Sequence, residues 1–425
     1  MDYFDEIVTS LQNKKHIFLT GGAGVGKTTI TNRVIEYFDK ESKKVAKLAS
    51  TGMASTLING QTLHSFFDFA IASSIDELML ANKFEIKPKI KKVILSIDLL
   101  IIDEISMVSD ELFDMIELRL SQADFKGAIL IVGDFLQLPP ITKNNEKIGF
   151  AFESKNWQKF DFKTITLTHI YRTDDAKFIE LLNHVRFAHV DEDVHNHLNS
   201  FIKPLPCDLS SSTFLFGKNI SASRHNKAQL DFIDNELFIK EAQVIKHNKN
   251  IKDSEIDRFF EDARIEKQLE IKVASPILFS RNSWNYFNGE RGVVVNIDEK
   301  YLYIEKKDGK VIKLEQVAQS KTKWVEKKID GAVEMVEDEL FTIYQYPIKL
   351  AFGITIHKSQ GMSIEDLIIQ TNEIFAPSQF YVALSRASNP HKLNLIAPSK
   401  QWRELIFVDK KAIDFTGMLS QETRL

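Results

Sequence analysis

The sequence predicts an α/β fold built from two parallel-sheet cores, with a smaller β-rich insertion in the second core. The first supporting observation is that short apolar runs alternate with amphipathic helical stretches in the first third of the chain. This pattern is typical of a doubly wound parallel sheet that binds ligands at the carboxyl ends of its strands. The strands expected there are residues 17–20, 45–50, 99–103, 128–132 and 164–167.

The second observation is that the same alternation returns later in the chain and predicts another α/β core. Its expected strands are residues 213–216, 277–279, 367–371 and 393–396. The third is a glycine-punctuated, β-rich stretch at 282–346, where several short strands separated by turns indicate a small barrel. We therefore expect a first core at 1–165, a second core at 166–281 and 347–425, and an inserted β domain at 282–346.

The motif Gly21-Gly22-Ala23-Gly24-Val25-Gly26-Lys27-Thr28 follows the first apolar run and precedes a helical stretch at 29–38. Strand, glycine-rich loop and helix in this order predict a cradle for the phosphates of a nucleoside triphosphate. The backbone N–H groups surround the β-phosphate, Lys27 reaches the β- and γ-phosphates, and the Thr28 hydroxyl binds Mg²⁺. The helix N-terminus near Thr29 also favours phosphate binding. The alternative is a plain glycine-rich turn with a surface lysine, which the flanking strand and helix argue against.

The apolar strand at 99–103 ends in two acidic residues, Asp103 and Glu104. We expect Asp103 to hold Mg²⁺, which neutralises charge on the transferred phosphoryl group. Glu104 is then the expected base, because a carboxylate beside the metal can orient and deprotonate the attacking water. Acids at strand ends are often turn or cap residues, but the phosphate-binding motif favours the catalytic interpretation.

Several other segments have no expected role in a simple nucleotide hydrolase. The segment GDFLQLPP (133–140) follows a strand and brings Gln137 to the γ-phosphate side, where we expect it to sense hydrolysis. The segments TGMA (51–54) and GQTLHSF (60–66) offer hydroxyls, amides and an aromatic ring that suit the phosphates and stacked bases of a single strand. Two late segments, ITIHKSQG (354–361) and YVALSRA (381–387), follow in the order expected of a second motor core.

Composition limits the class of protein. The 425 residues are 44% hydrophobic, which suffices for two or three domains. The single cysteine, Cys207, excludes a disulfide framework and most structural zinc sites. With no apolar secretion segment and no run that could span a bilayer, we expect a cytoplasmic protein without a membrane partner, associated with the nucleoid if bacterial. The formal net charge of −4 places any nucleic-acid site in a local groove.

Taken together, these segments resemble the superfamily-one DNA helicases, most closely their Pif-type (petite integration frequency) branch, with the RecD and Dda helicases as cousins. The resemblance covers about residues 15–395. Its ordered motifs are GGAGVGKT, LASTGMAS, GQTLHSF, LLIIDEISMVS, GDFLQLPP, LTHIYR, FNGERG, ITIHKSQG and YVALSRA. It implies two RecA-like P-loop cores, an SH3-like inserted barrel, a small wedge at 66–90, and ATP with Mg²⁺ as cofactors.

The resemblance also implies roles for individual residues. Arg172 and Arg386 correspond to arginine fingers that reach the γ-phosphate from the second core, and Gly361 belongs to the nucleotide site. Such fingers couple hydrolysis to closure of the cores. The expected DNA-binding residues are Thr51, Gly52, His64, Phe66, Thr355, His357 and Lys358. A helix cap, a core histidine or a core phenylalanine is the structural alternative for each of these residues.

The N-terminus departs from the pattern of this group. Helicases of the group usually place an adenine-reading glutamine well upstream of the phosphate loop, whereas here only Gln12, nine residues before Gly21, is present. Tyr3 or Phe4 could supply stacking on the base. We therefore expect no strong selectivity for ATP over other triphosphates.

These observations predict an ATP-dependent DNA helicase that translocates on single-stranded DNA as a monomer, with only the resemblance implying the 5′-to-3′ direction. The expected partners are single-stranded, forked and partial-duplex DNA, with G-quadruplex DNA as a further candidate. The alternative is an ATP-controlled DNA clamp or translocase that does not unwind, but Arg172, Arg386 and Gln137 together favour a motor. A fused nuclease is disfavoured because no further acidic metal cluster is evident.

Overall fold

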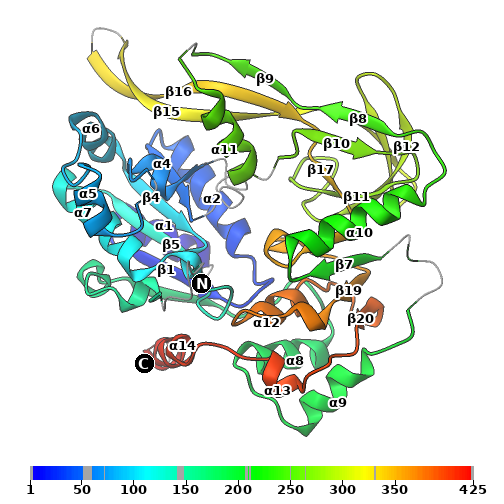
Figure 1. Cartoon of the computed structure of the whole chain (residues 1–425). Coiled ribbons are helices and arrows are strands. Elements are labelled where there is room, and N and C mark those ends of the chain that lie inside the picture. The colour runs from blue at the N-terminus through cyan, green and yellow to red at the C-terminus, as the bar shows by residue number, and fades with distance from the viewer. Residues whose placement is uncertain are drawn as a thin grey trace.

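The computed structural model describes residues 3–422 apart from residues 51–59, 71, 141–147, 206–208, 210–211, 249, 264 and 330–331. Two parallel sheets form two α/β cores, and antiparallel sheets form a β-rich region next to the second core (Figure 1). The predicted fold class is confirmed. No helix in the described part of the chain is long and apolar enough to cross a bilayer.

The first core contains a six-stranded parallel sheet. In spatial order its strands are β3 (Gln61–Thr62), β2 (Val45–Ala49), β4 (Leu99–Asp103), β5 (Ala128–Gly133), β1 (Ile17–Gly21) and β6 (Lys163–Leu167). The central strands are buried on both faces, which explains why they read as continuous apolar runs. All five strands predicted for this core are present within one residue of the expected bounds, and only the two-residue β3 was not predicted.

Helices cover both faces of this sheet. On one face, α1 (Tyr3–Gln12) and α2 (Lys27–Lys40) pack in a cluster that includes Leu19, and on the other face α7 (Asp110–Ala123) packs in a cluster that includes Phe18. Neighbouring strand residues point to opposite faces, so one apolar run supplies both clusters. Three shorter helices complete the second face: α4 (Leu63–Phe66), α5 (Ile75–Leu80) and α6 (Pro88–Ser96).

Residues 66–90, the segment expected to form a wedge, contain α5 and the first turn of α6. Pro88 begins α6, where its fixed φ and missing N–H are tolerated. Arg119 on α7 is only 2% exposed, and it donates hydrogen bonds to the carbonyl oxygens of Phe67 (3.2 Å) and Phe84 (2.7 Å). These two bonds tie both ends of the segment to the first core.

The second core contains a four-stranded parallel sheet. In spatial order its strands are β18 (Gly353–Thr355), β7 (Thr213–Phe216), β19 (Leu367–Ile369) and β20 (Leu393–Leu395). Its helices are α8 (Ala176–Arg186), α9 (Glu192–Ser200), α10 (Asn219–Asp231), α12 (Gln379–Leu384) and α13 (Trp402–Leu405). The assignment of residues 277–279 to this sheet was wrong, because they pair antiparallel in the β-rich region, and β18 takes the place beside β7.

The β-rich region is centred on a five-stranded antiparallel sheet, which extends beyond the predicted bounds of 282–346 because Pro276–Phe279 and Ile348–Leu350 pair into it. In spatial order its strands are β14 (Val311–Leu314), β13 (Leu302–Lys306), β12 (Arg291–Ile297), β11 (Pro276–Phe279) and β17 (Ile348–Leu350). The remaining elements nearby are β8 (Phe238–Glu241), β9 (Gln243–Lys246), α11 (Asp253–Ala263), β10 (Gln268–Ile271), β15 (Val317–Ile329) and β16 (Ala332–Gln345).

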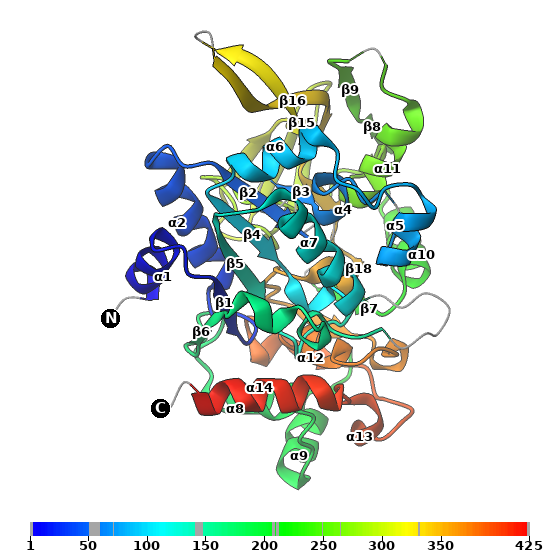
Figure 2. The same ribbon diagram turned by 90° about the vertical axis from the view of Figure 1, so that its left-hand side faces the viewer.

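The long hairpin of β15 and β16 reaches from this region to the first core, where it passes beside α6 (Figures 1 and 2). Its contacts with the first core include two polar ones. The side-chain amide of Gln61 donates to the Thr322 hydroxyl (2.9 Å), and the Lys321 ammonium donates to the Ser65 hydroxyl (3.1 Å).

The C-terminal helix α14 (Lys410–Glu422) packs against the first core, on the side shown in Figure 2. Phe415 stacks on Phe152 with ring centroids 4.1 Å apart and planes 3° from parallel, and Ala412 is fully buried. The predicted boundary assigned residues 347–425 to the second core. The chain instead returns to the first core after α13.

Candidate active site

The phosphate loop connects β1 to α2 and is held in a conformation that requires glycine. Gly24 and Gly26 have φ angles of +79° and +85°, which side chains with a Cβ rarely adopt. Space is also limited at Gly24, because a Cβ there would lie 2.8 Å from the Cβ of Arg172. The loop and the first turn of α2 therefore line a cleft with little side-chain bulk in the way of phosphate groups.

Lys27 begins α2 and points back into the loop. Its ammonium donates to the carbonyl oxygens of Gly21 (2.7 Å) and Gly22 (2.9 Å). Burial lowers the pKa of Lys27, while the neighbouring Asp134 and Glu104 carboxylates oppose that shift. An anionic phosphate in the cleft would further favour the charged ammonium.

Asp103 and Glu104 lie at the carboxyl end of β4, facing the same cleft. Glu104 has a left-handed backbone with φ of +54°, and its N–H donates to Oδ1 of Asp103 at 2.8 Å. Burial raises the pKa of Asp103 to about 7, and the Glu104 carboxylate adds to that rise. Burial also raises the pKa of Glu104, whereas Lys27 opposes the shift. Carboxylate and hydroxyl oxygens are the ligands that Mg²⁺ prefers in proteins. Asp103, Glu104 and the Thr28 hydroxyl therefore fit the expected metal.

Two arginines line the cleft. Arg172 lies beside the phosphate loop, where the neighbouring Tyr171 N–H donates to the Gly24 carbonyl oxygen (2.9 Å), and Arg386 belongs to the second core. Arg172 follows β6 and donates to the Ser363 hydroxyl (2.9 Å) and the Ser385 carbonyl oxygen (2.6 Å). Arg386 follows α12, is 2% exposed and donates to the Val382 carbonyl oxygen (2.9 Å). Burial lowers the pKa of Arg172 to about 9 and that of Arg386 to about 10. Both guanidinium groups are poorly solvated, so an anionic ligand in the cleft would be strongly attracted to them.

Gln137 lies beyond the end of β5, and Asp134 holds it in place. Its backbone N–H donates to the Asp134 carbonyl oxygen (2.9 Å), and its side-chain amide donates to Asp134 Oδ2 (3.4 Å). Gln137 is 7% exposed and lines the cleft. Its position is therefore coupled to that of Asp134.

A single cleft of about 560 Å³ between the two cores brings most of the predicted residues together. Those that line it are Ala23, Gly24, Val25, Gly26, Lys27, Thr28, Thr29, Asp103, Glu104, Gln137, Arg172, Gly361 and Arg386. Gly21 and Gly22 are not part of this lining, and their carbonyl oxygens instead accept from Lys27. The clustering brings both cores to one site, while the individual roles stay predictions.

Two contacts across the cores were not predicted from the sequence. The Tyr381 hydroxyl on α12 accepts the backbone N–H of Ala23 in the phosphate loop at 2.9 Å. The Arg186 guanidinium on α8 donates to both carboxylate oxygens of Asp134, at 2.8 and 3.1 Å. Tyr381 is the first residue of the motif YVALSRA (381–387), so the motif could have identified it as a candidate site residue. Arg186 lies in an ordinary amphipathic helix, and no local pattern marks it.

The end of the cleft near the N-terminus is aromatic and cationic. Tyr3, Arg33 and Tyr171 line it, and Tyr171 is 72% exposed. Gln12 is not part of the lining, and its side-chain amide donates to the Tyr37 hydroxyl at 3.0 Å. The structure thus places Tyr3 and Tyr171 at this end of the cleft and leaves Gln12 outside its lining, while the weak base selectivity stays a prediction.

Three of the predicted DNA-binding residues line a second and larger cleft, of about 1080 Å³. Thr355 ends β18, and His357 and Lys358 follow it. The exposed ring of Phe375 lines the same cleft, as does Pro139, which follows the predicted sensor Gln137. Cationic, hydroxyl and aromatic groups that face one groove can contact both phosphates and bases.

Of the other four predicted DNA-binding residues, the two that the structure describes, His64 and Phe66, are not part of the lining of this groove. Thr51 and Gly52 lie outside the described residues. The His64 Nε2 lies 3.1 Å from the Ala72 carbonyl oxygen. Phe66 is 4% exposed and packs edge-on against Phe67. The structure therefore corrects the placement of Phe66, because a base cannot stack on a ring buried in the core.

Comparison with known proteins agrees with this geometry. The family model of the PIF1-like helicases matches residues 2–196. The ATP-dependent DNA helicase Pif1 of Campylobacter jejuni is 37% identical over 423 residues, covering 94% of each chain. A crystal structure of Bacteroides sp. Pif1 with ADP-AlF4 is 25% identical, with a TM-score of 0.82 over 99% of this chain and 97% of that one. Bacteroides Pif1 bound to ssDNA, also 25% identical, gives a TM-score of 0.66 over 100% of this chain and 97% of that one. This chain belongs to the PIF1-like helicase family and is an ATP-hydrolysing DNA helicase.

Proposed function

We propose that this helicase moves 5′-to-3′ along single-stranded DNA and couples each ATP hydrolysed between its cores to duplex unwinding. The observation that carries the proposal is the shared cleft, in which Arg172 and Arg386 face Lys27 and Glu104. Because groups from both cores are needed at the same triphosphate, the hydrolytic arrangement exists only when the cores are close together. ATP binding would therefore favour closure, and product release would favour opening.

The chemistry assigned to the first core follows from its side chains. On nucleotide binding, Lys27 exchanges its hydrogen bonds to loop carbonyl oxygens for the β- and γ-phosphate oxygens. Glu104 orients the attacking water and accepts its proton as the water attacks the γ-phosphorus in line. Thr28 and Asp103 would hold Mg²⁺, which when bound neutralises charge on the phosphate oxygens.

The two arginines supply positive charge where the transferred phosphoryl group becomes most negative. Arg172 and Arg386 hold their guanidinium groups in a buried, poorly solvated setting, where an electrostatic interaction is stronger than in water. A trans-acting arginine of this kind contributes on the order of 10³-fold or more to the rate. Gln137 would change its position with the presence of the γ-phosphate. The change would pass to the second cleft through Leu138 and Pro139, which line it.

The second cleft is the proposed DNA path. It contains Thr355, His357, Lys358 and the exposed Phe375 ring, and it begins just beyond the Gln137 segment. Bacteroides Pif1 has been solved bound to ssDNA, which supports the same ligand for this chain. The 5′-to-3′ direction rests on the family resemblance. Forked DNA, G-quadruplex DNA, a monomeric state and a cytoplasmic location stay predictions.

The test is ATP-dependent unwinding of two partial duplexes of identical sequence, one with a 5′ single-stranded tail and one with a 3′ tail. Lys27→Ala serves as the blank, since it removes the ammonium that binds the phosphates. Unwinding of the 5′-tailed substrate alone is expected. Unwinding of only the 3′-tailed substrate would overturn the direction.

Measuring ATP hydrolysis in the same samples separates the motor from the clamp. Strong stimulation by single-stranded DNA is expected for a translocating motor. Hydrolysis that single-stranded DNA does not stimulate, with neither duplex unwound, would favour the ATP-controlled clamp.

A further inference from the structure

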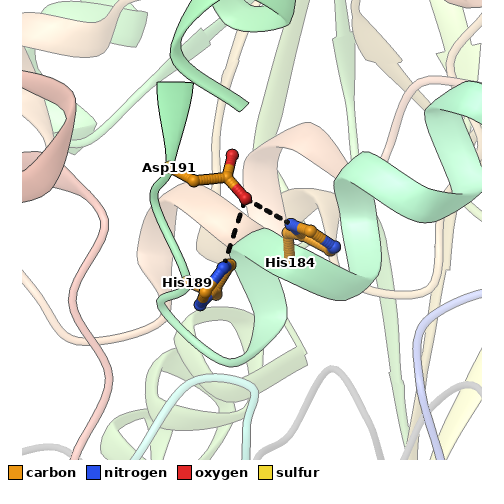
Figure 3. A group of neighbouring side chains, drawn as sticks. All are labelled: His184, His189 and Asp191. Atoms are coloured by element: carbon orange, nitrogen blue, oxygen red, sulfur yellow. Dashed lines mark ion pairs between the residues drawn. The ribbon is translucent and has the colours of Figure 1, made fainter. Parts of the chain in front are cut away.

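Two histidines and an aspartate converge where α8 ends and α9 begins, away from the nucleotide cleft. His184 lies in the last turn of α8, His189 lies in the connecting segment, and Asp191 is the N-cap residue of α9. Figure 3 shows both imidazole rings directed at the same carboxylate. Among the residues that the structure describes, these three form the group of three or more histidine, cysteine and acidic side chains that lie close enough together to hold a metal ion.

The spacing of the three donor atoms is close to that of a coordination shell. His189 Nε2 lies 3.2 Å from Oδ2 of Asp191, and His184 Nδ1 lies 3.7 Å from the same oxygen. All three donor atoms lie within 4.8 Å of one another. Tetrahedral zinc with bonds of 2.0–2.2 Å holds its ligand atoms about 3.3 Å apart, so small rotations of exposed side chains would complete the geometry.

The fold holds the Asp191 side chain in place and closes the turn that carries His189. Asp191 accepts the Val194 backbone N–H on Oδ1 at 2.8 Å, which leaves Oδ2 directed at the histidines. The His189 backbone N–H donates to the His184 carbonyl oxygen at 2.9 Å, which closes the turn.

His184 provides the second, independent observation. Its Nδ1 is shielded from solvent and has no hydrogen-bond partner among the described residues. At 3.7 Å the Asp191 oxygen is too far away to satisfy it. A shielded imidazole nitrogen without a hydrogen-bond partner that faces a carboxylate is suited to a metal ion in the tautomer that leaves its lone pair free.

We propose that His184, His189 and Asp191 form a binding site for a divalent transition metal, with Zn²⁺ as the expected ion and water as the fourth ligand. Two imidazoles and one carboxylate match the ligand sets of zinc sites with an open position. Mg²⁺ and Ca²⁺ are disfavoured, because both prefer oxygen ligands. The site lies outside the nucleotide cleft and takes no part in the chemistry proposed there.

A metal at this site would join the end of α8 to the start of α9. Arg186, which pairs with Asp134 across the cores, lies two residues after His184 on α8. Fixing the end of this helix would also restrict the backbone that carries Arg186. Occupancy of the site is therefore expected to raise the midpoint of thermal unfolding.

The test is titration of the tag-free, nucleotide-free protein with Zn²⁺ by calorimetry, in excess Mg²⁺ to occupy the phosphate site. Co²⁺ absorption gives a second readout of ligand geometry. Asp191→Asn removes the carboxylate but keeps a good N-cap residue, so α9 is preserved. His189→Ala removes an exposed ligand. His195→Ala is the matched control, because His195 is an exposed α9 histidine that contacts Asn199 instead.

One equivalent of Zn²⁺ bound with micromolar affinity is expected in the unaltered protein and in His195→Ala. Both ligand variants should bind at least tenfold more weakly and lose the rise in unfolding midpoint. Equal affinity in all four proteins would overturn the assignment, because binding would then reside elsewhere. The proposal would also fail if the unaltered protein bound only at millimolar Zn²⁺.

Discussion

The ion pair between Arg186 and Asp134 gives the sharpest test of how the two cores hold together. Arg186 is carried by α8, whose apolar side chains pack in the second core, and Asp134 follows β5 of the first core. Their side chains are 13% and 1% exposed, and the guanidinium forms two hydrogen bonds to the carboxylate. Arg186→Ala leaves the Asp134 carboxylate buried near Lys27 without its main partner.

The size of the effect follows from this burial. Removing one partner of a buried ion pair costs about 3–5 kcal/mol, because the other charge stays desolvated. Lys27 compensates part of the loss, since it also favours the charged form of Asp134. At the lower value of about 3 kcal/mol, the closed arrangement becomes on the order of 10²-fold less populated. We expect kcat for DNA-stimulated ATP hydrolysis to fall by a similar factor.

The assay is steady-state ATP hydrolysis at saturating single-stranded DNA, with kcat and KM determined separately. Arg186→Lys should lose less activity, because it keeps the charge but not the two-pronged geometry. Arg186→Ala combined with Asp134→Asn should be less impaired than the sum of the single variants, because no buried charge is left alone.

Arg258→Ala is the matched control, since Arg258 forms an exposed ion pair with Asp262 on α11 and should change little. Unfolding midpoints would show whether each variant is folded. Activity of Arg186→Ala within twofold of the unaltered enzyme would refute the reasoning, and so would strictly additive losses in the double variant.

Three further predictions concern the site and the first core. Glu104→Gln should bind nucleotide normally but lose single-turnover hydrolysis, and normal turnover would show that another group activates the water. Arg386→Ala should bind ATP and DNA yet hydrolyse on the order of 10³-fold more slowly, measured as kcat beside binding by fluorescence anisotropy. Burial lowers the pKa of His16, whose Nδ1 accepts the Ile129 N–H at 3.1 Å, so the folded state favours the neutral ring. This stabilisation is present above about pH 6.5 and is lost as the pH falls, so His16→Gln should flatten the acid-side decline of the unfolding midpoint.

The sequence predicted the first core well because its strands are fully buried and therefore continuously apolar. The phosphate loop and the acids after β4 follow such strands, so strand position and motif reinforced each other. Parallel strands end at the same edge of a sheet, which is why Lys27 and Glu104 share a cleft although they are far apart in sequence. Motifs tied to strand ends could thus be placed before the structure was known.

Features that depend on which elements meet could not be predicted in this way. An apolar run such as 277–279 fits a buried strand of a parallel sheet as well as one of an antiparallel sheet. Only its pairing with β12 and β17 assigns it to the antiparallel sheet. Phe66 follows a mostly polar segment and fits a surface as well as a core. Only its burial and its packing against Phe67 place it in the core. The role of Arg186 depends on its ion pair with Asp134, which lies 52 residues earlier in the sequence and in the other core. The sequence around Arg186 therefore could not predict it.

Several contacts between the cores are polar and can be made and broken, although Ala23 and Leu138 of the first core also pack in the apolar cluster of the second core. The Tyr381 to Ala23 bond, the Arg186 to Asp134 pair and the hairpin contact at Thr322 are all polar. Water, phosphate or DNA can replace such partners at modest net cost, whereas exposing apolar surface costs about 25 cal/mol per Å².

The contact made by α14 is apolar, because Phe415 stacks among aromatic side chains of the first core. It should therefore persist while the polar contacts exchange. The segment between α13 and α14 would then tether the second core to the first and limit how far the two separate during each cycle.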